Sequence, residues 1–275
     1  MITGMSTSCF FSRENVEDSI DVMADMGVKN IEVFLNTLCE YEEDYIRELK
    51  KRIDARGMKV LSVHPQGVQF ELQMYTPYER TVKDAKDIFK KVLRAGELLG
   101  ATGYVYHGGY NIKPGKSRPP IERIAKITSE CANEARNYGI NFLYENVHWC
   151  WYCYPDFATE ILNCELSDKV YFNLDIKQAA QAGYSYRDFL YKMAGRLKNV
   201  HLCDYTLKSN GAVVPVAPFC GVTDLFELKE ELNNMGYDGP VILELYSGNY
   251  KDYSELSEVF KGVSEVFSDK SSLFK

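Results

Sequence analysis

The chain has 275 residues, of which 45% are hydrophobic and 26% are charged, as in an ordinary soluble globular protein. Its formal net charge of −7 and isoelectric point near 5.3 disfavour non-specific nucleic-acid binding, which needs clustered Lys and Arg. No segment approaches the roughly 18 apolar residues of a membrane-spanning helix, and the first residues lack a secretory pattern, so we expect a cytoplasmic protein without a membrane or nucleic-acid partner.

Short runs rich in β-branched and aromatic residues recur along the chain with a period of roughly 30 residues, as in a series of βα units. No Pro-, Gly- or Ser-rich linker and no shift in composition interrupts the series. We therefore expect one domain over residues 1–275. The predicted strands cover residues 2–10, 30–34, 59–65, 103–109, 141–147, 170–176, 199–205 and 240–246.

Amphipathic segments lie between these strands, apolar at a spacing of three to four residues. Thr223 is a predicted N-cap, and a last helix is predicted to begin at residues 253–255. Four of the segments end in a glycine that we interpret as a helix C-cap. They are residues 41–57, 81–100, 121–139 and 223–236, which end in Gly57, Gly100, Gly139 and Gly236.

Strands that alternate with helices imply parallel strands joined by right-handed crossovers. Two architectures satisfy this rule, a closed (β/α)8 barrel and an open doubly wound sheet. The count of eight strands favours the barrel, and the first strand is not followed by the Gly-x-Gly-x-x-Gly motif of a dinucleotide-binding sheet. The predicted fold class is therefore α/β, a single-domain (β/α)8 TIM barrel.

Polar side chains gather at the carboxyl ends of the predicted strands. Three of the four histidines lie there, and carboxylates hold the same position in other strands. In a barrel of parallel strands all these ends meet on one face. An ionised carboxylate inside an apolar run costs several kcal/mol unless it is paired or metal-bound. The seven residues are Glu32, His64, His107, Glu145, Asp175, His201 and Glu244.

A metal site is favoured over ion pairs for Glu145, Asp175, His201 and Glu244, because the strands supply few cations to pair with the acids; Lys177 is the main one near a carboxyl end. The remaining three residues stay open between a second metal, hydrogen bonds to substrate and simple lining of the pocket. For the Glu32 side chain, structural and functional roles are equally compatible with the sequence.

The eight cysteines are scattered along the chain and are predicted to be reduced thiols. The spacing of Cys150 and Cys153 also occurs in zinc and redox sites. Since the sequence has no second pair of this kind, we favour loop cysteines packed beside Trp149 and Trp151. His148, in the same loop, is predicted to lie at the surface or rim.

In their order and spacing these motifs resemble the xylose isomerase-like TIM-barrel superfamily, which includes sugar and sugar-phosphate isomerases and epimerases of the tagatose 3-epimerase type, and endonuclease IV. The resemblance covers essentially the whole chain. It rests on NIEVF, SVHPQG, YVYHGG, LYENV, NLDIKQA, NVHLCDY and the closing FCGVTDLFELKEELNNMGYDGPVILELY.

In epimerases of this type one divalent metal is held by Glu, Asp, His and Glu of strands five to eight, and both Glu residues also transfer protons. By resemblance these are Glu145, Asp175, His201 and Glu244, with Glu145 and Glu244 catalytic. One nitrogen and three carboxylates suit Mn²⁺, Mg²⁺ or Co²⁺ and are compatible with Zn²⁺.

The resemblance implies a metal-dependent sugar or sugar-phosphate isomerase or epimerase that transfers a proton through an enediolate. The implied partner is a small sugar or polyol, and the sequence also permits a homo-oligomer. The expected substrate-binding residues are Glu32, His64, His107, Trp149, Lys177, Gln178 and Tyr246.

The sequence departs from the family pattern at two positions. Many members carry Asp-x-x-His on strand six, where this chain has Gln178, and an Arg about six residues past the strand-seven His, where it has Leu207. With Lys177 beside it, Gln178 keeps a lyase of the inosose dehydratase type, or another carbohydrate-modifying enzyme, as an alternative. A non-catalytic sugar-binding or partner subunit is a third. The missing histidine and the acidic charge argue against DNA repair.

Overall fold

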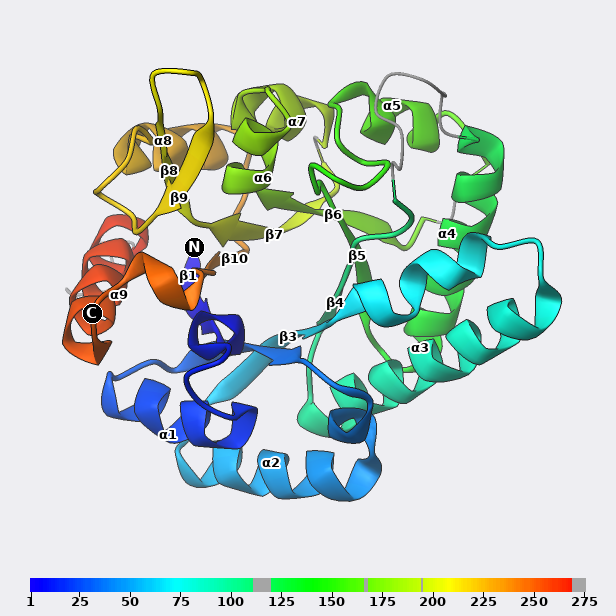
Figure 1. Cartoon of the computed structure of the whole chain (residues 1–275), viewed down its shortest axis with the longest axis horizontal. Helices are drawn as coiled ribbons and strands as arrows, with labels where there is room; N and C mark the ends of the chain where they lie inside the picture. The colour runs from blue at the N-terminus through cyan, green and yellow to red at the C-terminus, as the bar shows by residue number, and fades with distance from the viewer. Residues whose placement is uncertain (111–119, 166–167, 194, 269–275) are drawn as a thin grey trace.

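The computed structural model describes residues 1–110, 120–165, 168–193 and 195–268. Eight parallel strands close into a barrel in the order β1-β10-β7-β6-β5-β4-β3-β2, with helices around it (Figure 1). This arrangement confirms the predicted single-domain (β/α)8 TIM barrel. The barrel strands are β1 (Ile2–Ser6), β2 (Asn30–Leu35), β3 (Lys59–Pro65), β4 (Gly103–Tyr106), β5 (Asn141–Glu145), β6 (Val170–Asp175), β7 (Leu197–Leu202) and β10 (Pro240–Leu243).

The connecting segments place helices on the outside of the barrel (Figure 1). Their buried apolar side chains belong to the same core as those of the strands. The four glycines predicted to end helices all have positive φ, between 65° and 75°, which confirms them as left-handed helix ends. The helices are α1 (Val16–Asp25), α2 (Glu43–Ala55), α3 (Glu79–Leu99), α4 (Ile121–Asn137), α5 (Asp156–Leu162), α6 (Ile176–Gln181), α7 (Tyr186–Lys192), α8 (Leu225–Asn234) and α9 (Tyr253–Phe267).

Several strands end earlier than predicted. The 3-10 helix η1 (Thr7–Phe10) replaces the end of the first predicted strand, and the chain turns away from the fourth strand at Gly108, whose φ is 78°. The end of the seventh enters an antiparallel hairpin of β8 (Asp204–Leu207) and β9 (Val213–Val216). The predicted strands were too long because β-branched and aromatic residues continue into the loops. Residue composition therefore does not show where the hydrogen bonds between neighbouring strands end.

Hydrophobic side chains of the strands and helices form one continuous core. Part of it is a group of fully buried aromatic rings that includes Tyr104, Phe142, Tyr144, Tyr152 and Phe157; the last two stack with their ring centroids 4.8 Å apart. These rings stabilise the wall of the barrel behind the carboxyl ends of β4 and β5. Among the helices of the described residues, none combines the length and apolarity needed to cross a membrane.

The N-cap of α8 differs from the prediction by one residue. The Asp224 carboxylate accepts hydrogen bonds from the backbone N–H groups of Phe226 and Glu227, at 2.9 and 3.1 Å. Thr223 instead donates its backbone N–H to Asp204. Both side chains are good caps, and the carboxylate is further favoured by the helix dipole.

We expect Asp224→Ala to lower the free energy of unfolding by about 1 kcal/mol, because two N–H groups at the start of α8 lose their acceptor. Thr223→Ala is the matched control, since the replacement leaves its backbone hydrogen bond intact. Urea denaturation of the two variants measures the difference. Equal losses would contradict the assignment of Asp224 as the cap.

Candidate active site

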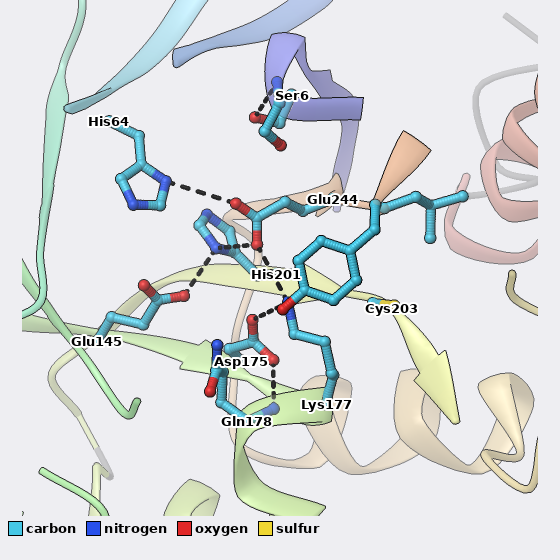
Figure 2. Close-up of polar contacts among 12 residues, drawn as sticks. Ser6, His64, Glu145, Asp175, Lys177, Gln178, His201, Cys203 and Glu244 are labelled. Carbon is cyan, nitrogen blue, oxygen red and sulfur yellow. Dashed lines mark hydrogen bonds and ion pairs between the residues drawn. The ribbon is translucent and has the colours of Figure 1, made fainter. Parts of the chain in front are cut away.

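The carboxyl ends of the barrel strands bring all seven predicted polar residues together. The barrel supplies them in chain order from β2, β3, the end of β4, β5, β6, β7 and the end of β10. Figure 2 shows five of them, the side chains of His64, Glu145, Asp175, His201 and Glu244, pointing toward one another above the barrel. All seven are buried except His107, which is partly exposed.

One group of four meets at the Nδ1 atom of His201. Glu145 Oε1 lies 2.9 Å from this nitrogen and Glu244 Oε2 lies 3.2 Å from it (Figure 2). Together with Asp175, these residues each offer one ligand atom, and the four atoms lie within 4.8 Å of one another. The spacing places three carboxylate oxygens and one imidazole nitrogen around a single point.

Glu32 lies behind His201 and has no exposed surface. Its Oε2 atom is 3.1 Å from His201 Nε2 and also accepts the Ser62 hydroxyl at 2.7 Å, while His64 Nδ1 lies 3.4 Å from Oε1. A carboxylate that accepts Nε2–H leaves the Nδ1 lone pair of the same imidazole for a ligand. Glu32 therefore orients His201, and it does not line the pocket as expected of a substrate-binding residue.

Backbone contacts set the direction of the Asp175 carboxylate. Its Oδ1 atom caps α6 by accepting the backbone N–H of Gln178 at 2.7 Å. The Asn146 side chain holds the Asp175 backbone through its N–H and its carbonyl, both at 2.8 Å. Asn173 donates to Glu145 Oε1 at 2.9 Å. Neither asparagine was predicted as a site residue, although each is a polar residue within a predicted strand.

Lys177 is nearly buried beside these acids, with 3% of its surface exposed. Its Nζ atom lies 3.3 Å from Asp175 Oδ2 and 3.8 Å from Glu244 Oε2 (Figure 2). The centre of the Tyr246 ring is 4.6 Å away. Burial alone lowers the pKa of a lysine, but Asp175 and Glu244 raise the pKa of Lys177 well above its usual value. The ammonium is therefore a fixed cation at one side of the cluster.

Gln178 occupies the position where the family pattern has a histidine. Its Oε1 atom accepts the backbone N–H of His148 at 3.2 Å and lies 2.5 Å from His148 Nδ1. His148 is partly buried at the rim, as predicted, and it also fixes the orientation of the Gln178 amide. The amide nitrogen of Gln178 is thereby left to face the pocket.

The cluster opens into a pocket of about 320 Å³, a volume in the range of small-ligand sites. Aromatic side chains form much of its wall, and polar groups of the strand ends form its floor. The aromatic residues are Phe11, Phe34, Trp149 and Tyr246; the polar ones include His64, His107, Glu145, Lys177, Gln178 and Glu244.

Negative charge is in excess around His201. Burial raises the pKa of Glu32, but the imidazoles of His201 and His64 outweigh it and lower the pKa to about 2. On the other side of the cluster, burial raises the pKa of Asp175 to about 6; Lys177 opposes the shift and the carboxylates of Glu145 and Glu244 add to it. Lys177 therefore offsets only part of the negative charge around Asp175.

The residues present fit a divalent metal. Two buried atoms that face the centre, Asp175 Oδ2 and His201 Nδ1, form no well-directed hydrogen bond within the described part of the chain. Their close contacts are ion pairs, with Lys177 for the former and with Glu145 and Glu244 for the latter. Three carboxylates and one imidazole form a donor set suited to hard or borderline divalent cations. A bound cation would satisfy both atoms and offset the excess negative charge.

Another group, of three residues, also has the spacing of metal ligands. It consists of His64, His107 and Glu145. The Nε2 atoms of the two histidines lie 2.9 Å apart, and His107 Nε2 is 2.7 Å from Glu145 Oε2. Both imidazoles line the pocket, so a ligand there meets them directly.

The cysteine pair in the loop after β5 lies in the folded interior. Within the described residues all cysteines are free thiols, and Cys150 is buried while Cys153 is partly buried. Burial raises the pKa of the Cys150 thiol well above its usual value. A protonated buried thiol supports the interpretation as loop cysteines over a redox pair.

Glu71, in the 3-10 helix η4 (Glu71–Tyr75), is a buried acid with a structural role that was not predicted from the sequence. Its carboxylate accepts the Tyr104 hydroxyl at 2.8 Å and the backbone N–H groups of His107 and Gly108 at 2.9 and 3.0 Å. Burial raises its pKa. The contacts hold the chain that carries His107 over the pocket. Its position in the apolar run FELQMY was the available signal.

We expect Glu71→Leu to lower the free energy of unfolding by about 3 kcal/mol or more, because three buried donors lose their acceptor. Glu71→Gln retains one acceptor oxygen, and its loss is expected to be smaller. Chemical denaturation of both variants gives the two values. A Glu71→Leu protein as stable as the wild type would contradict this role.

Comparison with known protein families identifies the barrel fold. A family model described as xylose isomerase-like TIM barrel matches residues 20–263. Comparison with curated protein sequences finds no match.

Solved structures cover the whole barrel. A D-tagatose 3-epimerase-like protein has a TM-score of 0.78 at 20% identity, over 97% of this chain and 98% of that one. The IOLI protein with a bound zinc atom has 0.79 at 20%, over 98% of both. The probable 3-DHS dehydratase AsbF of Bacillus anthracis has 0.72 at 13%, over 98% and 100%. These likenesses show the fold. Because the family model spans most of its length, the chain belongs to the xylose isomerase-like TIM-barrel family.

Proposed function

We propose that the protein is a metal-dependent sugar or sugar-phosphate isomerase or epimerase that transfers a proton through an enediolate. In this proposal Glu145, Asp175, His201 and Glu244 hold one divalent metal. The observation that carries it is the double placement of Glu145 and Glu244, which both lie beside His201 Nδ1 and both line the pocket. The similar folds of a D-tagatose 3-epimerase-like protein and of the IOLI protein with a bound zinc atom support it.

The two glutamates are suited to proton transfer at carbon. They come from β5 and from the end of β10, so they approach a ligand from different sides of the pocket (Figure 2). A bound divalent cation supplies Lewis acidity toward the carbonyl and hydroxyl oxygens of the substrate. One glutamate takes the proton next to the carbonyl, and the other returns a proton to the opposite face, which inverts the centre. If a single glutamate does both, the result is an aldose–ketose isomerisation.

The other pocket residues bind and orient the sugar in this proposal. His64, His107 and the amide nitrogen of Gln178 face the pocket with groups that hydrogen-bond to hydroxyls. Trp149 and Tyr246 offer aromatic faces to the apolar face of a sugar or polyol. In this proposal Gln178 binds a substrate hydroxyl in place of the histidine of the family pattern.

A second candidate is metal-assisted elimination of the inosose dehydratase type. It is favoured by the ammonium of Lys177 in the pocket and by the similar fold of the probable 3-DHS dehydratase AsbF. Elimination and epimerisation share the first proton removal and differ in the bond that breaks afterwards.

We expect the protein loaded with Mn²⁺ to introduce solvent deuterium at carbon into a member of a panel of ketoses, aldoses, their phosphates and inososes. Glu145→Gln and Glu244→Gln are each expected to slow this exchange about 10²- to 10⁴-fold, because each removes a proton-transfer group. Mass spectrometry and NMR of the recovered sugars provide the measurement.

Glu48→Gln, on the exposed surface of α2, is the matched control and keeps wild-type exchange. Loss of water from an inosose or a keto sugar would favour elimination. Absence of exchange with the whole panel, with metal bound, would contradict the proposed function.

A further inference from the structure

Lys177 has no role in the family pattern, yet it occupies a central place in the pocket. It is the single Lys or Arg side chain among the described residues that line the cavity. It lies in the first turn of α6, two residues after Asp175, and is almost fully buried. Lysine is almost never buried to this extent without strong partners.

The two carboxylates beside the ammonium are ion-pair partners and do not form short hydrogen bonds with it. Its distances to Asp175 Oδ2 and Glu244 Oε2 are 3.3 and 3.8 Å, longer than the 2.7–2.9 Å typical of a charge-assisted hydrogen bond. The centre of the Tyr246 ring lies 4.6 Å from the ammonium. An ammonium has three N–H donors, so these contacts leave it able to donate a short hydrogen bond to an oxygen in the pocket.

We propose that Lys177 is a catalytic residue whose ammonium donates a hydrogen bond to the substrate oxygen that becomes anionic during proton transfer. The inference rests on the proposed function. A glutamate removes the carbon-bound proton, the C–H electron pair forms the new C=C bond, and the carbonyl π pair moves to oxygen. Lys177 stabilises that oxygen and keeps its own proton. The reverse electron movement and return of a proton to carbon complete the step.

The position of Lys177 Nζ indicates which substrate oxygen this is. The Nζ atom lies within 4 Å of Asp175 and Glu244, two of the four residues proposed to hold the metal. A substrate oxygen bound at the metal site would therefore also lie beside the ammonium. Preorganised donors in a water-poor site stabilise a developing oxyanion more strongly than water does.

The proposal differs from a structural role in a measurable way. A lysine that only neutralises Asp175 and Glu244 would change metal binding and stability, with no preference for anionic ligands. A lysine that binds the oxyanion determines the affinity for a planar anion that resembles the enediolate. Glycolohydroxamate is such a probe, and its binding requires no turnover.

The experiment measures glycolohydroxamate affinity by calorimetry, and metal content by elemental analysis, for Mn²⁺-loaded wild type, Lys177→Met and Lys177→Arg. We expect Lys177→Met to bind the probe about 10- to 100-fold more weakly, as for a lost hydrogen bond to a charged group, with full metal content. Lys177→Arg is expected to recover part of the affinity. Lys192→Met, on the surface of α7, is the control.

Probe affinity within threefold of wild type in metal-loaded Lys177→Met would overturn the proposal. Loss of metal in both Lys177→Met and Lys177→Arg would also overturn it, because the lysine would then serve to position the acids. Absence of probe binding by the wild type would overturn it as well. Sugar exchange is a separate readout: without exchange but with selective loss of probe binding, the proposed reaction fails and the oxyanion contact of Lys177 stands.

Discussion

The site depends on how the charge of four carboxylates around one buried imidazole is balanced. Glu32 contacts His201 Nε2, while Glu145 and Glu244 contact Nδ1. Isolated buried carboxylates cost several kcal/mol each, and Lys177 is the one ammonium beside the cluster within the described residues. The negative charge of these carboxylates therefore suits a divalent cation, which would neutralise it at the centre of the cluster, where the pocket begins.

The barrel imposes this arrangement through strand register. Asp175 on β6 lies opposite His201 on β7, and Glu145 on β5 lies opposite Asn173 on β6. Parallel strands with aligned carboxyl ends bring residues from separate βα units to one face. Residues that act through their neighbours then fix the ligand directions: Glu32 orients His201, and Asn146 orients the Asp175 backbone.

Much of this could be predicted from the sequence, because apolar runs with a period near 30 residues determine strands and polar residues at their ends are conspicuous. The positions at which the strands end could not be predicted, because the loop residues that follow have the same composition as the strands. The role of Glu32 could not be predicted either, because it depends on which ring nitrogen of His201 the carboxylate contacts. That contact is set by the tertiary structure. Glu71 reads as an ordinary charged residue until three donors from distant segments converge on it.

If Glu32 holds His201 so that its Nδ1 atom and three carboxylates bind one divalent cation, metal affinity depends on Glu32. Calorimetric titration of metal-free protein with Mn²⁺ measures this dependence. We expect the wild type to bind one equivalent, and Glu32→Gln to bind with about 10- to 100-fold lower affinity, the effect of losing a group that orients a ligand. No binding by the wild type, or unchanged affinity in the variant, would contradict it.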